Sequence, residues 1–282
     1  MGAEQEDALR VSPAGDRPGR ADSLPSAGTA EAGRAAGSRK WKARKILWTV
    51  WGGAVVAAFY YANHYRLEQN WLKKRAEEIV HAAGVSGSEQ ETMALRDYVR
   101  THVRYEGVDQ ESRPFFRSSA RETLESGQGY CGEATRAFIC LAGQRGIKAQ
   151  RVNLYGRTNH VVAEVLTRPN REVLVDVQDN PDTNPYLDKA KLTVHQVAND
   201  PLSPFTEYSN IHLRRLPFIG PYIQHIKLEQ SWFTWVLENP SLLKSILWGG
   251  IAFAAALVFV VDRLLVRFYA FRFGLKHSRK AV

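Results

Sequence analysis

The stretch SGQGYCG, residues 126–132, decides how the central part of this chain is interpreted. Glycines crowd a cysteine, and the residues that follow at once, EATRAFICLAGQRG, form a helix-like run that ends near Gly146. If that helix begins at or just after Cys131, the thiol faces free backbone N–H groups and the positive end of the helix dipole. Both effects favour the thiolate, which is the reactive form of cysteine.

The chain contains two cysteines, and the sequence gives them different expected roles. Gly127, Gly129 and Gly132 allow a sharp turn around Cys131 and the close approach of a substrate. A lone cysteine without such surroundings is more often a small buried hydrophobic residue. Cys140 fits that description, because it lies in the apolar run AFICLA. On a regular helix the two thiols point to opposite sides, which excludes a disulfide between them.

The residue pattern changes after this helix. The segments AQRVNLY, HVVAEVL and EVLVDVQ alternate with a period of two and predict three strands. Helical patterns precede them, among them a run from Ser88 in which Ser88 and Glu91 have the spacing of a capping box. Helices followed by strands indicate an α+β domain with an antiparallel sheet.

The second and third of these strands predict a hairpin. If it turns about residue 168, His160 lies directly opposite Asp176, at a distance that permits an imidazole–carboxylate hydrogen bond. The same register opposes Glu164 to Glu172, and a bulge or a longer loop near Pro169 would relieve that repulsion. One face of the hairpin carries only valine and alanine and is expected to be buried.

Cysteine, histidine and aspartate in this order suit nucleophilic catalysis. Cys131 would attack an acyl carbon, and His160 would take the thiol proton and return it to the leaving amine. Asp176 would fix the imidazole tautomer and stabilise the imidazolium. The oxyanion would need donors, for which the backbone N–H of Cys131 is the first candidate and the side chain of Gln128 the second.

Residues 120–178 resemble the core of the transglutaminase-like superfamily, which has a papain-related fold, and the chain looks like a membrane-anchored, bacterial-type member. The resemblance is carried by GYCGEATRAFICLAGQRGIKAQRV, by HVVAEV and by LVDV. It implies Cys131 as nucleophile, His160 as base and Asp176 as orienting residue, with reactions at glutamine or peptide amides. Val162 and Val177 stand where the family often has an aromatic residue and a proline, which bears on the shape of the pocket.

Two apolar runs predict two transmembrane helices. Residues 46–62, ILWTVWGGAVVAAFYYA, carry no charge, and residues 242–261, LLKSILWGGIAFAAALVFVV, carry one lysine near an end. A cleaved signal peptide is the alternative for the first run, but the long polar leader and the lack of a small-residue cleavage site argue against it. Each run contains a Gly-Gly pair, which would allow close helix packing but is also common in membrane helices.

The formal charge of +9 suggests either nucleic acid or a membrane surface as partner. Basic residues gather before the first run and after the second, not in residues 85–200, so the membrane is favoured and nucleic acid is not expected. Both termini should then be cytoplasmic, although Arg66 and residues 73–75 weaken the bias. The expected organisation is a disordered tail (1–38), a first span (39–65), an extracytoplasmic transglutaminase-like domain (66–240), a second span (241–264) and a basic tail (265–282).

Two classes of function remain open at this point. The first is a cysteine peptidase, amidase or protein-glutamine acyltransferase acting on a peptide or protein amide, with hydrolysis favoured because water attacks a thioester unless it is excluded. The second is a non-catalytic binding or assembly module of a cell-envelope or polysaccharide-export complex. Residues 179–225 look loop-like, and the aromatic residues of 205–240 suggest a collar at the membrane, a wall of the cleft or ordinary packing.

No cofactor or metal is expected. No phosphate-binding glycine loop and no paired cysteine motif occur in the chain. Six histidines outside the proposed site lack the spacing of metal ligands: His64, His81, His195, His212, His225 and His277.

Overall fold

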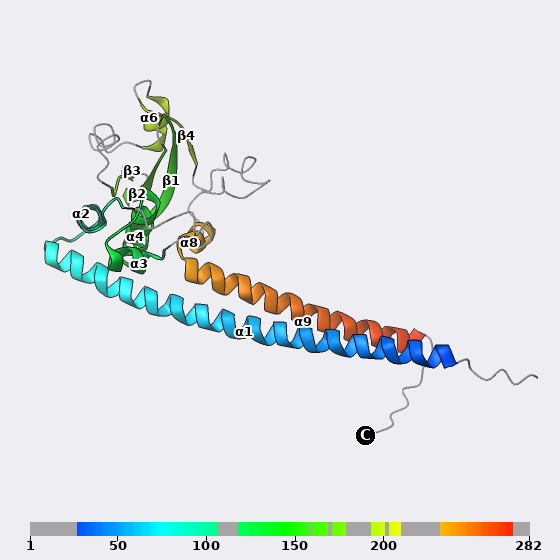
Figure 1. Cartoon of the computed structure of the whole chain (residues 1–282). Coiled ribbons are helices and arrows are strands. Elements are labelled where there is room, and N and C mark those ends of the chain that lie inside the picture. Colours follow the sequence, from blue (N-terminus) through cyan, green and yellow to red (C-terminus); the bar gives the residue numbers. More distant parts are fainter. Residues whose placement is uncertain are drawn as a thin grey trace, which may run out of the picture. The chain divides into compact units, whose positions relative to one another are not determined.

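The computed structural model describes residues 27–106, 118–157, 159–168, 171–178, 193–200, 203–209 and 232–272 (Figure 1). The chain divides into two compact units, residues 1–48 and residues 49–282. In the first unit the described residues belong to the beginning of α1 (Ala27–Ala83). Residues 27–38 are therefore helical, whereas the sequence interpretation placed them in a disordered tail. Their high alanine content favours the helix without any apolar face to bury.

The second unit contains the rest of α1, the remaining helices and the sheet. The helices are α2 (Ser88–His102), α3 (Ala120–Ser126), α4 (Cys131–Gln144), α6 (Val194–Asn199), α8 (Trp232–Glu238) and α9 (Pro240–Arg272). The strands are β1 (Lys148–Gly156), β2 (His160–Arg168), β3 (Arg171–Val175) and β4 (Phe205–Ser209).

The four strands form one antiparallel sheet in the order β3-β2-β1-β4. This confirms the predicted α+β class with an antiparallel sheet. The fourth strand is a correction, because β4 lies in the segment that the sequence interpretation treated as loop. β4 is only five residues long and pairs with β1 alone, so its own residues carry little alternation and its partner supplies the hydrogen bonds.

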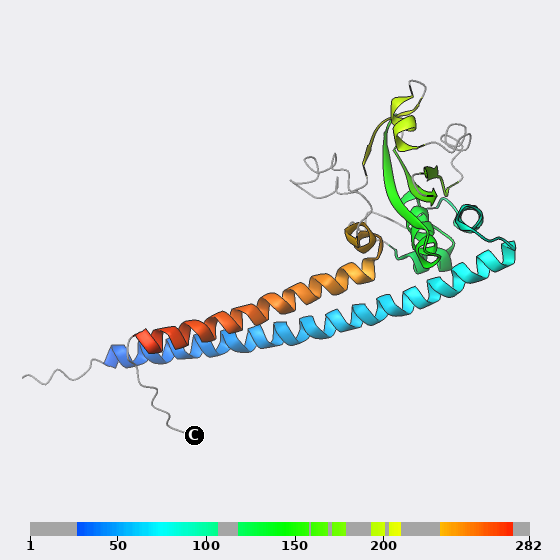
Figure 2. The same ribbon diagram turned by 180° about the vertical axis from the view of Figure 1, so that it is seen from behind.

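Helices cover both faces of the sheet. On one face α4 packs against β1 and β2, with α2 and α3 beside it, and buries a core that includes Phe138, Leu141 and Val165 (Figures 1 and 2). On the other face α6 packs against β4, and a second cluster gathers around Val152 and Phe205. The face of the β2–β3 hairpin toward α4 is buried, as predicted, and the other face is buried only in part.

The β2–β3 hairpin forms as predicted, but the register predicted from the sequence is wrong by two residues. Glu164 pairs with Leu174 rather than with Glu172, and the register shifts between Leu166 and Arg168. An irregularity at this place removes the repulsion between carboxylates that the simpler register would create. The side chain of Glu164 instead accepts a hydrogen bond from Gln150 Nε2 at 2.8 Å.

The predicted capping box of α2 is also wrong, although the helix does begin at Ser88. The Ser88 hydroxyl donates to the carbonyl of Thr167 at 2.7 Å, so it fastens the helix to β2. Glu91 forms a bidentate ion pair with Arg145 at the end of α4, with Nε–Oε2 at 2.8 Å and Nη2–Oε1 at 3.2 Å. Both side chains are used between elements rather than within one helix turn, which local spacing does not reveal.

Among the described residues, α9 is the one helix long and apolar enough to cross a membrane by length and composition. The sequence interpretation predicted two, and the run of residues 46–62 within α1 is not found as the second. That run is short, and its tryptophans, tyrosines and glycines lower its mean hydropathy. Side chains still connect the two helices: the Ser245 hydroxyl donates to the Ala58 carbonyl at 3.0 Å, and the Lys244 ammonium lies 5.3 Å from the Tyr61 ring centre.

Candidate functional site

Cys131 is the first residue of α4, as the glycine-rich approach predicts. Gly127 ends α3 with a left-handed φ of 65°, which favours glycine. At Gly129 a Cβ atom would lie 2.9 Å from Glu133 Cβ, so any larger residue would push α4 away. The Glu133 carboxylate accepts the Tyr130 N–H at 3.2 Å and caps the helix. The turn that leads from α3 to Cys131 is therefore held in place at both of its ends.

His160 is the first residue of β2, and Asp176 follows β3 directly. His160 Nε2 and Asp176 Oδ2 are 3.0 Å apart, and the two residues are 2% and 5% exposed. The strand that carries the histidine is tied to the helix that carries the cysteine, because the Thr135 hydroxyl donates to the Val161 carbonyl at 3.0 Å. Segments distant in the sequence thus meet at one place.

Asp176 is held at both its side chain and its backbone. Its Oδ1 accepts the backbone N–H of Gln178 at 3.1 Å, and its carbonyl accepts Arg100 Nη2 at 3.0 Å. Since Oδ1 is occupied in this way, Oδ2 is the oxygen that faces the histidine. This arrangement leaves the second ring nitrogen of His160, Nδ1, for the thiol.

The pKa of His160 is raised to about 9. Burial alone would lower it, but hydrogen bonds to Asp176 and to Cys131, together with the charges of both residues, outweigh the burial. Cys131 therefore lies close enough to the imidazole to contribute to the raised pKa of His160. At neutral pH the histidine is therefore held as an imidazolium between an aspartate and the cysteine.

The structure gives the candidate oxyanion donor, Gln128, a different partner. Its Nε2 donates to the Glu106 carboxylate at 3.3 Å, so the amide would have to leave that carboxylate before it could serve an oxyanion. Its role stays a prediction, as do the catalytic roles of Cys131, His160 and Asp176.

Gln178 was missed by the sequence interpretation. Besides supporting Asp176 through its backbone, its Nε2 donates to the Gly129 carbonyl at 3.2 Å, and the residue is buried. It therefore joins the aspartate to the turn before Cys131. A polar residue two positions after the expected aspartate, just beyond β3, was the available signal.

An aromatic pair lies close to the thiol. Tyr105 and Tyr130 meet edge to face, with ring centres 5.3 Å apart. Burial raises the pKa of Tyr105, and the charges of Cys131 and Tyr130 act in the same direction. Tyr105 is nevertheless 58% exposed, so an apolar ring surface is open to solvent beside the cysteine. Nothing in the periodicity around Tyr105 distinguished it from a loop residue.

Cys140 behaves as the buried hydrophobic residue that was predicted. It is fully buried and unpaired with Cys131, and burial raises the pKa of its thiol far above the usual range. Within the described ranges, no three His, Cys, Asp or Glu side chains gather in a way that could hold a metal ion.

Parts of the chain are similar to known proteins. Two solved structures resemble the chain: a candidate cysteine protease from Cytophaga hutchinsonii (18% identity, TM-score 0.34) and a candidate protease from Parabacteroides distasonis (9% identity, TM-score 0.33). The matches cover 39% and 43% of this chain but only 37% and 26% of those proteins. No curated protein matches the chain. The family pattern of the transglutaminase-like superfamily matches residues 73–177 and includes the cysteine, the histidine and the aspartate, so this part of the chain is a transglutaminase-like domain.

Proposed function

We propose that the chain is a membrane-anchored cysteine enzyme that cleaves or transfers amide bonds through a thioester at Cys131. The observation that carries this proposal is the buried His160–Asp176 hydrogen bond of 3.0 Å, formed close to Cys131 at the first turn of α4. Each residue has the neighbours that its role requires: a helix N-terminus for the sulfur, a carboxylate for the imidazole, and the backbone N–H of Gln178 for the carboxylate.

The proposed reaction follows from these positions. The thiolate attacks the amide carbon, and the oxyanion that forms is stabilised by N–H groups at the start of α4. His160 gives its proton to the nitrogen as the C–N bond breaks, which leaves an acyl-thioester and a free amine. Water then attacks the thioester while His160 takes one of its protons, and the acid is released. An amine in place of water would give transfer; hydrolysis is favoured because water attacks a thioester unless it is excluded from the site.

The first test is acylation of Cys131 in the full chain. We expect 4-nitrophenyl acetate to acetylate Cys131 stoichiometrically and much faster than N-acetylcysteine, because the histidine maintains the reactive ion pair. His160→Ala should slow this reaction by about 10²-fold or more, and Cys131→Ser should abolish it. Mass spectrometry of the intact chain and of its peptides measures both the rate and the site.

The outcome distinguishes the two classes of function. Cys140 is an internal reference, since its buried thiol should stay unmodified while the protein is folded. Acetylation of Cys131 at the rate of an ordinary thiol, unaffected by His160→Ala, would contradict the enzyme and leave a binding or assembly module. A peptide or protein fragment trapped on Cys131 would identify the substrate class.

We also propose that α9 and residues 46–62 of α1 both cross the cytoplasmic membrane, with the domain between them outside and both termini inside. The exposure of α9 supports this, because only 11% of its most apolar window is buried within the protein. Large apolar side chains on both helices are exposed, among them Phe59 and Phe253. Such a surface would be costly in water and is typical of contact with lipid.

The membrane topology can be measured with reporter fusions at residues 30, 150 and 280. A reporter that is active only outside the cytoplasmic membrane should give signal at residue 150 alone, because the basic flanks retain both ends inside. Signal at residues 150 and 30 together would mean that only α9 spans the membrane.

A further inference from the structure

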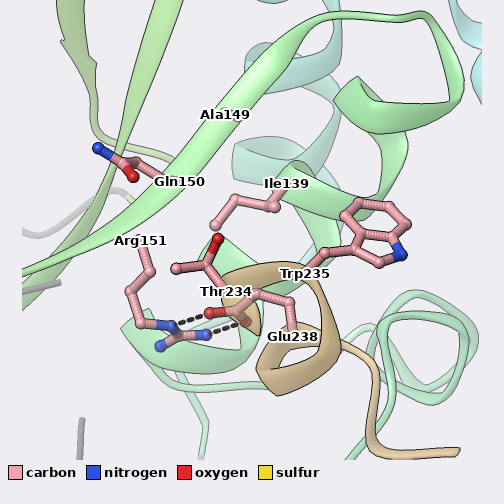
Figure 3. Close-up of a pocket in the computed structure, with 7 residues that line it drawn as sticks. All are labelled: Ile139, Ala149, Gln150, Arg151, Thr234, Trp235 and Glu238. Carbon is pink, nitrogen blue, oxygen red and sulfur yellow. Dashed lines mark hydrogen bonds and ion pairs between the residues drawn. The ribbon is translucent and has the colours of Figure 1, made fainter. Parts of the chain in front are cut away.

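A buried ion-pair cluster joins α8 to the first turn of α4. Glu238, the last residue of α8, accepts two hydrogen bonds from Arg151 on β1, one from Nε to Oε1 and one from Nη2 to Oε2 at 2.6 Å (Figure 3). Arg136 on α4 lies on the same carboxylate, with Nε 3.4 Å from Oε2. The Nη2 atom of Arg151 also donates to the carbonyl of Gly132 at 2.8 Å. A carboxylate on α8 is thus connected through one guanidinium to the residue that follows Cys131.

Burying these charged side chains lowers the stability of the fold unless their attraction compensates for the lost hydration. Arg151 is 7% exposed and projects from the side of β1 that faces α4, where its strand neighbour Ala149 and its cross-strand partner Ala163 are apolar and buried. Removing such charges from water costs several kcal/mol per ion before their attraction is counted, and a buried ion pair often stabilises a fold no more than apolar residues would. Packing alone therefore does not explain an arginine at this position.

The geometry of Arg151 explains it better. A guanidinium is planar and presents its donors in a fixed fork, so anchoring one edge on Glu238 determines where the remaining N–H points. It points at the carbonyl of Gly132, which lies in the peptide plane between Gly132 and Glu133, one plane beyond the peptide that joins Cys131 to Gly132. Holding that plane restrains the first turn of α4, from which the thiol and the candidate oxyanion N–H project.

The charge of Arg151, like its hydrogen bond to Gly132, acts on the Cys131 site. Burial opposes the charged guanidinium, but the charge and hydrogen bonds of Glu238 outweigh it and raise the pKa of Arg151. The charges of Glu133 and Cys131 contribute to this rise, so the guanidinium is close enough to attract the thiolate. Burial opposes the ionised form of Glu238, but the charges and hydrogen bonds of Arg151 and Arg136 outweigh it and lower the pKa of Glu238, which stays a carboxylate.

We propose that Arg151 is a positioning residue for the Cys131 nucleophile and that Glu238 acts through it, so that the end of α8 sets the reactivity of the site. This inference rests on the proposed function, since it concerns the same thiol. Glu238 is followed by Asn239 and then by Pro240, the first residue of α9. The link therefore makes the reactivity of Cys131 depend on how the start of α9 is seated against the domain.

The decisive variant is Arg151→Met in the full chain. It removes the donor to Gly132 but leaves Glu238 paired with Arg136, so the cluster keeps one charge of each sign. We expect acetylation of Cys131 by 4-nitrophenyl acetate to slow by about 10-fold to 100-fold, because small displacements of a reacting group have effects of this size. Arg151→Lys, which keeps a charge without the fork, should give an intermediate rate.

A double-mutant cycle tests whether Glu238 acts through Arg151. Glu238→Gln alone should slow the reaction, and adding it to Arg151→Met should cause no further loss. The control is Glu91→Gln, which breaks the bidentate pair between Glu91 of α2 and Arg145, the residue that follows α4 at the end remote from Cys131. That variant should lower the unfolding midpoint while the rate stays that of the wild type.

The possible outcomes separate the two proposals. A fast, His160-dependent wild-type reaction with an unchanged rate in folded Arg151→Met would overturn the positioning role alone. Equal slowing in Arg151→Met and Glu91→Gln would assign the effect to general destabilisation and overturn it as well. A wild-type rate no faster than N-acetylcysteine would overturn both the enzyme and the positioning inference.

Discussion

Replacing Asp176 by asparagine should slow the acetylation of Cys131 by about 10²–10⁴-fold while the protein remains folded. The reason lies in the second hydrogen bond of the carboxylate. Because the backbone N–H of Gln178 donates to Oδ1, an asparagine at 176 would keep its oxygen there and turn its amide nitrogen toward His160. A donor would then face the ring N–H, and the imidazole would lose both its acceptor and the stabilising charge.

The same variant should change the pH dependence. In the wild type the imidazolium beside the thiolate attracts an anionic reagent, so alkylation of Cys131 by iodoacetate should fall as the pH rises through about 9, where His160 loses its proton. The bond and the charge of Asp176 raise that pKa, so Asp176→Asn should move the falling limb to lower pH. Rates measured from pH 5 to 10 check this.

A matched control is Asp97→Asn, which makes the same chemical change at an exposed carboxylate on α2 that pairs with Arg96. It should change neither the rate of acetylation nor the pH at which alkylation by iodoacetate falls. Wild-type behaviour in Asp176→Asn would show that the His160–Asp176 hydrogen bond has no part in the reactivity of the thiol.

The largest loss of stability is expected from Glu238→Ala. Two guanidiniums, those of Arg136 and Arg151, would remain buried without their shared carboxylate, and leaving a buried charge unpaired costs about 3–5 kcal/mol. The midpoint of denaturant unfolding of the full chain in detergent, followed by tryptophan fluorescence, measures the change. Glu91→Ala is the comparison: its partner Arg145 is 30% exposed and can be rehydrated, so the loss should be near 1 kcal/mol.

The contribution of Glu238 also has a defined pH range. Its folded pKa lies below the ordinary value of 4.5, so its stabilisation is complete above that pH and is lost as the pH falls through the folded pKa. The difference in unfolding midpoint between wild type and Glu238→Ala should therefore shrink in acid. A difference that is small and constant over the whole range would mean that water or another anion neutralises the two arginines.

The local part of the fold could be predicted from the sequence. The start of α4 at Cys131 follows from glycines, a helix-like run and an acidic residue in the first turn, all within a few positions. The β2–β3 hairpin follows from alternation on both sides of a turn. The meeting of His160 and Asp176 was expected, but through a register two residues away from the true one, because a bulge does not change the alternation that predicts a strand.

Long-range contacts could not be predicted in the same way. Glu91 has the spacing of a capping residue but pairs with Arg145 instead. β4 forms because it pairs with the edge of β1. Arg151 was visible as a charged residue at a position facing inward on a strand, yet its partner Glu238 lies 87 positions away. A single sequence gives no measure of such pairings, since neither propensity nor periodicity connects distant segments.

The place of Glu238 in the chain affects how the protein can be divided for study. The region that matches the family ends at residue 177, and Glu238 lies well beyond that limit. A fragment trimmed to the family boundaries would still contain the cysteine, the histidine and the aspartate. It would nevertheless leave an arginine without its counter-ion under the reactive turn, so inactivity of such a fragment would say nothing about the intact protein.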